Sequence, residues 1–90
     1  MTIMNNECYK IIKNGRSLSN EDYSIIKEQI KLFEEGLNNY KKDKEYYQDI
    51  PYWQYDYLDF KYQTFMAENV EIELEILKKV IKNKIRLLNF

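Results

Sequence analysis

The sequence predicts an all-α fold, in which a short N-terminal helix and two long antiparallel helices form a helical hairpin or a three-helix bundle. Apolar residues recur at helical spacing in three segments, and helix-capping signals separate these segments. Only one segment shows strand-like alternation, and no second strand is visible to pair with it. We expect the 90 residues to form a single domain, 1–90. A domain of this size buries a modest core, so we expect it to dimerise.

The first predicted helix covers roughly residues 2 to 13. Its apolar face carries Met4, Cys8, Ile11 and Ile12. Gly15 follows in a position suited to a left-handed helix cap. No cation or base is apparent near the Cys8 thiol, so we expect Cys8 to be a small buried hydrophobe and not a reactive thiol.

The second predicted helix runs from about 20 to 48. Ser19 and Asp22 fit a capping box at its start. Gly36 could end a shorter helix, but the apolar pattern continues through it in phase, so the pattern favours one continuous helix. The expected core stripe of this helix consists of Tyr23, Ile26, Ile30, Phe33, Leu37, Tyr40 and Tyr47.

The third segment opens with the aromatic stretch PYWQYDYLDFKYQTF, residues 51 to 65. A strand is one interpretation, because aromatic residues favour strands and alternate here over a few positions. A helix from about 51 to 88 is the interpretation we favour, since Pro51 suits a first helical turn and the apolar spacing continues downstream. This helix would turn one aromatic stripe inward, made of Tyr55, Leu58, Tyr62 and Phe65.

The third helix is apolar over an unusually wide arc, whereas a hairpin needs one apolar stripe per helix. The surplus must cover the first helix, a second copy of the chain or a partner. Asn69 falls in line with this arc, where it could fix the register between helices or point to solvent. The predicted core or dimer interface consists of Ile72, Ile76 and Val80 on one stripe, and Leu74, Leu77 and Ile81 on the other.

Helical phase separates a second group of side chains from the expected inner stripe. We expect Tyr52, Trp53, Asp56 and Asp59 to face a protein partner, because large aromatic rings are efficient interface anchors. Stacking of nucleic-acid bases on these rings is disfavoured, since acids surround them and Lys61 is the only cation from 51 to 75.

Charge is segregated along the third helix. Residues 51–75 carry six acids and one base, whereas residues 76–90 carry five bases and no acid. This is an ordinary arrangement for a helix, whose dipole favours acids near the N-terminus and bases near the C-terminus. It also leaves open contact with nucleic acid or anionic lipid through Lys78, Lys79, Lys82, Lys84 and Arg86.

Several chemical groups are missing from the composition. The chain has no His, one Cys and two Gly, which disfavours a multi-residue zinc site, an internal disulfide and a phosphate-binding glycine loop. Glu68, Glu71 and Glu75 share one helical face, which we interpret as solvated and not as a metal site. We therefore expect no cofactor, no metal and no enzymatic activity. Neither a signal peptide nor a membrane-spanning run is visible, so the expected location is the cytoplasm.

The sequence thus favours a small protein-binding module that regulates or inhibits a host factor through an acidic-aromatic helix face. Ile, Asn, Lys and Tyr supply 41 of the 90 residues, a bias typical of AT-rich codons and hence of a low-GC bacterium or its phage. Two alternatives stay open. One is nucleic-acid binding through the basic C-terminal end, and the other is an immunity-type helical protein at the inner membrane face.

Overall fold

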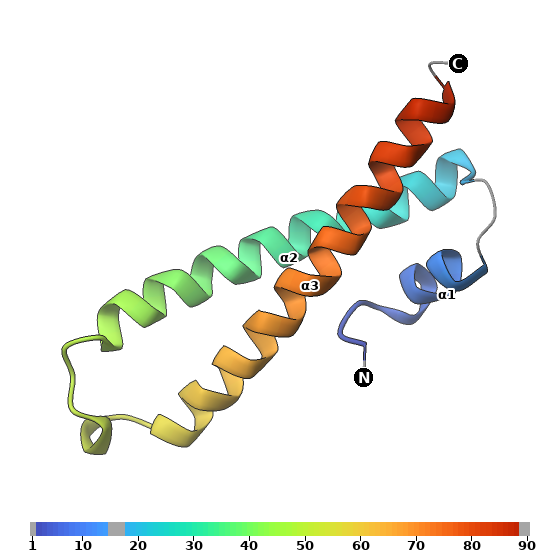
Figure 1. The fold of residues 1–90 in the computed structure, drawn as a ribbon. Helices are drawn as coiled ribbons and strands as arrows, with labels where there is room; N and C mark the ends of the chain where they lie inside the picture. Colours follow the sequence, from blue (N-terminus) through green and yellow to red (C-terminus); the bar gives the residue numbers. More distant parts are fainter. Residues whose placement is uncertain (1, 15–17, 89–90) are drawn as a thin grey trace.

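The computed structural model is an elongated arrangement of helices (Figure 1). In chain order these are α1 (Asn6–Asn14), α2 (Asn20–Tyr47), a short 3-10 helix η1 (Tyr52–Gln54) and α3 (Tyr57–Leu88). The structure describes residues 2–14 and 18–88, with the side chains of residues 14 and 84–88 left outside the description. No strand occurs in those two ranges, so the all-α prediction is confirmed.

Helix α1 is shorter than the sequence predicts. It begins at Asn6 because the Asn5 side chain accepts a hydrogen bond from the backbone N–H of Cys8, at 2.8 Å, in the manner of an N-cap. Ile11 and Ile12 pack against the core, as their helical spacing predicted. The predicted cap at Gly15 lies outside the described residues.

Helix α2 follows its prediction closely. The capping box is present: the Asp22 N–H donates to the Ser19 hydroxyl at 3.0 Å, and the Ser19 N–H donates to the Asp22 carboxylate at 3.2 Å. The helix continues through Gly36 without a break. Ile26 and Phe33, from the predicted core stripe, are buried.

Helix α3 begins at Tyr57, so the predicted helical start at residue 51 is wrong. Pro51 has extended backbone angles and precedes η1, and Tyr55 is extended again. Asp56 then caps α3, because its carboxylate accepts the Asp59 N–H at 3.0 Å. The aromatic stretch is therefore a 3-10 turn followed by a capped helix, and the alternative of a strand is wrong as well.

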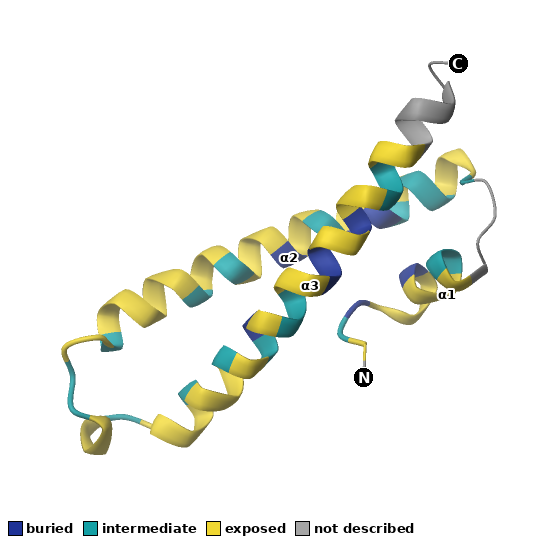
Figure 2. Ribbon diagram, in the orientation of Figure 1, coloured by how far each residue is buried: buried dark blue, intermediate teal, exposed yellow. Residues whose placement is uncertain are grey.

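Helices α2 and α3 form an antiparallel hairpin, and α1 packs beside the end remote from the turn (Figure 1). The described molecule measures 55 × 23 × 16 Å. Burial is concentrated where α1 meets the hairpin, whereas the turn end is largely exposed (Figure 2). The buried apolar core consists of Met4, Cys8, Ile26, Phe33, Leu74 and Leu77.

Two buried polar side chains fix the N-terminal segment to the hairpin. Glu73 on α3 accepts the backbone N–H of Ile3 at 2.8 and 3.0 Å and that of Met4 at 2.9 Å. Gln29 on α2 accepts the N–H of Asn5 at 2.9 Å. Both side chains are buried, so their hydrogen bonds replace the water that these backbone groups lose.

Candidate functional site

The hairpin turn presents the most exposed aromatic side chains of the described chain at its tip. Tyr52 is 61% exposed, Trp53 is 71% exposed and Tyr46 is 68% exposed. The rings of Tyr52 and Trp53 meet edge to face, with centroids 5.2 Å apart. We call Tyr46, Tyr52, Trp53 and Tyr57 the aromatic tip. Folding leaves most of this apolar area in water, where burial by a partner would be favourable.

A second layer of aromatic rings lies beneath the aromatic tip and joins its two sides. The rings of Tyr47 and Tyr55 stack with centroids 4.5 Å apart, and Tyr47 also meets Phe60 edge to face at 5.5 Å. Tyr40 stacks on Phe60, and its hydroxyl donates to the Thr64 hydroxyl at 2.8 Å. These contacts tie α2 to the start of α3, so the exposed rings are held on a supported turn.

Backbone hydrogen bonds define the shape of the turn itself. The Ile50 N–H donates to the Tyr47 carbonyl at 3.2 Å, and the Gln54 N–H donates to the Pro51 carbonyl at 2.9 Å. Pro51 has its φ preset near the observed −59°, so it loses little entropy on ordering. Tyr52 and Trp53 follow directly in η1, which accounts for their projection from the end of the hairpin.

The acids predicted to face a partner lie beside these rings. Asp56 and Asp59 are both exposed, as are Tyr52 and Trp53. Asp56 also has the structural task of capping α3, and the Asp59 carboxylate accepts the Gln63 amide at 2.9 Å. A lysine at Asp56 would therefore remove the cap together with the charge, whereas an asparagine removes the charge alone.

The predicted inward stripe of the third helix is wrong. Leu58 is 78% exposed, Tyr62 is 59% exposed and Phe65 is 60% exposed, and only Tyr55 is partly buried. Helix α3 instead turns Phe60 and Ala67 toward α2. Two apolar stripes compete along this helix. The stripe with the smaller side chains, including Ala67, packs on α2, while the bulkier one faces away from it.

Of the six residues predicted to form a core or dimer interface, four lie in or against the core and two are exposed. Leu74 and Leu77 are buried, and Val80 and Ile81 pack against the core at intermediate exposure. Ile72 and Ile76 remain exposed in the single chain, at 60% and 42%.

Asn69, which the sequence left between a helix contact and solvent, bonds within its own helix. Its side chain is partly buried, and its amide donates to the Phe65 carbonyl of the same helix at 3.0 Å. Asn69 lies on the same outward stripe as Phe65 and Ile72, so it belongs to a surface and not to the core of this chain.

The basic C-terminal end is described only in part. Lys78 forms an ion pair with Glu34 on α2 at 3.5 Å, with both side chains about half exposed. Lys79 and Lys82 are exposed. The side chains of Lys84 and Arg86 lie outside the described residues.

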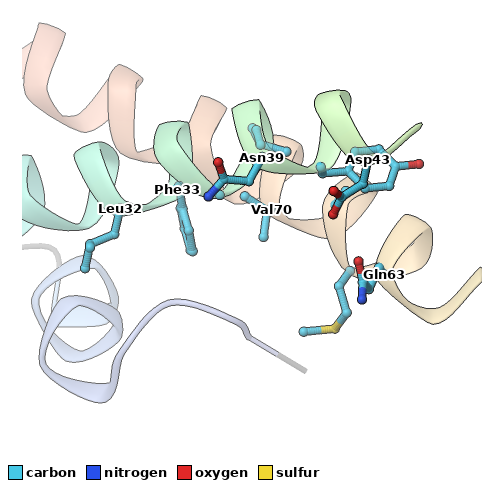
Figure 3. A pocket seen from close by; sticks show the side chains of 11 residues that line it. Leu32, Phe33, Asn39, Asp43, Gln63 and Val70 are labelled. Atoms are coloured by element: carbon cyan, nitrogen blue, oxygen red, sulfur yellow. The ribbon is translucent and has the colours of Figure 1, made fainter. Parts of the chain in front are cut away.

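An apolar groove of about 260 Å³ lies between α2 and α3 (Figure 3). Phe33, Asn39 and Val70 lie near its middle, while Asp43 and Gln63 lie toward one end. Small-molecule sites usually enclose about 300–1,000 Å³, so this groove is at most large enough for one or two apolar side chains of a partner. Gly36 also lines it, and an added Cβ there would meet nothing within 4 Å.

Cys8, the one thiol of the chain, is fully buried and is not poised for reaction. Burial raises the pKa of the Cys8 thiol, and the nearby Glu73 carboxylate raises this pKa further. A raised pKa keeps the thiol protonated and weakly nucleophilic. The prediction of a small buried hydrophobe is confirmed.

The described residues contain no cluster of three or more His, Cys, Asp or Glu side chains that could hold a metal ion. Glu68, Glu71 and Glu75 are all exposed. Among the helices as described, none is long and apolar enough to cross a membrane.

The residues that sequence reasoning missed are Glu73 and Gln29. Each lies next to apolar core positions of its helix: Leu77 follows Glu73 by four residues, and Phe33 follows Gln29 by four. This spacing places both polar groups on buried faces. Their position within an apolar stripe was therefore the available signal.

Comparison of the chain with models of known protein families, with curated proteins and with solved structures found no match.

Proposed function

We propose that this chain is a small, non-enzymatic protein-binding module whose binding surface is the aromatic tip of the hairpin. One observation carries the proposal: Tyr52 and Trp53 are 61% and 71% exposed on a turn that is supported by a second layer of packed rings. Large rings presented on an ordered turn bind with little loss of conformational entropy, which is typical of interface hot spots.

The charge around the aromatic tip indicates the chemistry of its partner. Asp49, Asp56 and Asp59 lie within or beside it, and the nearest cations in sequence are Lys44 on α2 and Lys61 on α3. The Lys61 ammonium sits over the Tyr57 ring, 5.1 Å from its centroid, at the flank of the tip. A basic protein surface would be attracted by the carboxylates, and this attraction should weaken with salt.

We also propose a role, a source and a location for the chain. Inhibition or regulation of a host factor in a low-GC bacterium or phage is supported by the AT-rich codon bias and the small size. A cytoplasmic location agrees with the buried, unpaired thiol of Cys8, since reducing compartments keep thiols free. Self-association is also proposed, and it concerns another face of α3.

Photocrosslinking tests the proposal. A photoreactive phenylalanine analogue replaces Trp53 in one variant and the exposed Glu35 of α2 in a control, and each is irradiated in lysate of a low-GC bacterium. We expect one protein adduct specific to position 53. Purified, that protein should bind wild type and lose at least about tenfold in affinity to Trp53→Ala, the size of effect that truncating an anchor produces.

A charge variant separates electrostatic attraction from damage to the fold. Asp56→Asn with Asp59→Asn retains the capping and side-chain hydrogen-bond acceptors but removes two charges. We expect weaker binding at low salt and a smaller difference from wild type at high salt. Adducts that form equally from positions 53 and 35 would contradict the proposal. Binding that depends on Lys79 and Lys82 and on added nucleic acid would favour the basic end instead.

A further inference from the structure

The face of α3 that points away from α2 carries an uncovered stripe of mostly apolar side chains. Its members follow one another at alternating spacings of four and three residues, the heptad spacing of a coiled-coil seam. The apolar members are between 42% and 78% exposed, and Asn69 is partly buried. We call this stripe the outer seam, and it consists of Leu58, Tyr62, Phe65, Asn69, Ile72 and Ile76.

The packing of the single chain does not account for the outer seam. Helix α3 buries Ala67, Leu74 and Leu77, while Glu73 binds the N-terminal segment. The seam runs from Leu58 to Ile76, a rise of about 27 Å at 1.5 Å per residue, and is one helix width of about 10 Å across. Its area approaches the roughly 300–600 Å² of the largest apolar patch on a typical monomer, a patch that is often functional.

We propose that the outer seam binds the outer seam of a second copy of this chain, with the two α3 helices antiparallel. The orientation follows from charge. Residues 51–75 carry six acids and one base, and residues 76–90 carry five bases and no acid. Parallel helices would place the two acidic halves side by side, whereas antiparallel helices bring each acidic start toward the basic end of the other copy.

One antiparallel register encloses the whole seam. In that register Leu58 lies opposite Ile76 of the second copy, Tyr62 opposite Ile72, and Phe65 opposite Asn69. The two-fold axis then crosses the seam at the level of residue 67, on the face of α3 opposite the Ala67 side chain, and each contact occurs twice, as a closed symmetric dimer requires. Sliding one helix by a heptad would leave seam residues at one end without an apolar neighbour.

The polar groups in and beside the outer seam are compatible with this register. The Asn69 amide already donates to the Phe65 carbonyl at 3.0 Å, so it does not depend on the Asn–Asn pair that parallel coiled coils use. On the flank of the seam, Lys61 would approach Glu75 of the second copy. Glu68 would approach its own symmetry mate, an unfavourable contact that is weak because Glu68 is exposed.

The mass of the protein in solution tests whether a second copy of the chain covers the outer seam. Sedimentation and light scattering of the full chain should give twice the 11.1 kDa chain mass. Phe65→Glu with Ile72→Glu should raise the dimer dissociation constant at least about thirtyfold, as loss of central anchors does. Leu32→Glu, at a side chain 51% exposed on α2, is the matched control and should remain dimeric. Unchanged circular dichroism in all three proteins excludes unfolding as the cause.

Disulfide trapping tests the orientation, in a background where the buried Cys8 is replaced by alanine. Glu68→Cys lies near the two-fold axis and should form a cross-linked dimer on oxidation. Ile76→Cys should not, because its two copies would lie about 27 Å apart, eighteen residues along the helix axis. Cross-linking at position 76 but not at 68 would overturn the antiparallel arrangement.

A monomer at high micromolar concentration would overturn the dimer itself, and so would a dimer that the Phe65→Glu and Ile72→Glu changes leave intact. Trp53→Ala should keep the dimer, because Trp53 lies outside the outer seam. Loss of partner binding through the aromatic tip and loss of self-association are thus distinguishable.

Discussion

Glu73 is a residue whose contacts reach beyond its own helix. Its carboxylate accepts three hydrogen bonds from two backbone N–H groups of the N-terminal segment, in a buried site. Hydrogen bonds to a charged group in such surroundings are worth more than neutral ones. Together with the Gln29 hydrogen bond to Asn5 and the burial of Met4 and Cys8, this side chain attaches the N-terminal segment to the hairpin.

We expect Glu73→Ala to lower the free energy of unfolding by about 2 to 3 kcal/mol, because it leaves buried N–H groups without an acceptor. Glu73→Gln keeps one acceptor oxygen and should lose less. Urea unfolding measures the stability, and amide exchange at Ile3 and Met4 should accelerate with it. Glu71→Ala, at an exposed position, should stay within about 0.5 kcal/mol of wild type. A Glu73→Ala variant as stable as this control would contradict the assigned role.

The Cys8 thiol gives the stability a dependence on alkaline pH. Its pKa in the folded chain is raised above the ordinary value of 9.0, so the folded state holds the proton more tightly than the unfolded state does. The resulting stability is fully present below pH 9.0 and is lost as pH rises through the higher folded pKa. Between pH 8 and pH 10 wild type should thus lose more stability in urea than Cys8→Ala. Equal losses would show that Cys8 is not the titrating group.

At the scale of elements, the start of α3 shows what sequence reasoning could and could not predict. Pro51 suits the first turn of a helix, and on that basis the helix was expected to begin there. Asp56 is an equally good signal, because aspartate is a preferred N-cap. Two valid start signals stood five residues apart, and the packing of Tyr55 on Tyr47 agrees with the later one. Local propensity alone could not rank them.

Asp56→Ala should therefore lower the free energy of unfolding by about 1 kcal/mol, the usual cost of losing an N-cap. Asp56→Asn should be nearly neutral, since its amide oxygen can accept the Asp59 N–H. Thermal and urea unfolding of the two variants give the comparison directly. If both variants lose the same stability, the charge and not the cap is what matters.

Substitution of Gly36 tests whether α2 is one continuous helix. It lies in the middle of the helix with open space where a Cβ would go. Gly36→Ala should then raise the free energy of unfolding by about 0.5 to 1 kcal/mol, because alanine has the higher helix propensity. A loss of stability would mean that the glycine is needed for a break in the helix.

At the scale of the whole molecule, the sequence predicted the fold class, the capping box and the core stripe through Ile26 and Phe33. It failed where two apolar stripes ran along one helix. Periodicity identifies both stripes of α3 but does not say which one faces α2, because that choice depends on how closely two backbones approach. The small side chain of Ala67 on the inward stripe was the available clue.

The aromatic tip and the outer seam were likewise predictable only in part. Tyr52 and Trp53 were expected from helical phase to face outward, and both are exposed, but they lie on a turn before α3, where that phase does not apply. The outer seam was expected to be partly core, and Tyr62 was assigned to the inside for that reason. Its 59% exposure changes the expected effect of substitution, from loss of stability to loss of association. Which stripe of α3 stays exposed is decided only by how the helices pack against one another.

On the proposed function, the aromatic tip is the surface that binds a protein partner. Acrylamide quenching of Trp53 fluorescence tests it most directly, because Trp53 is the only tryptophan of the chain and is 71% exposed. The quenching constant should be high for the chain alone, including its dimer, and should fall several-fold on binding of a tryptophan-free fragment of the captured partner, since interface anchors become fully desolvated. Binding demonstrated by sedimentation with an unchanged quenching constant would contradict the claim.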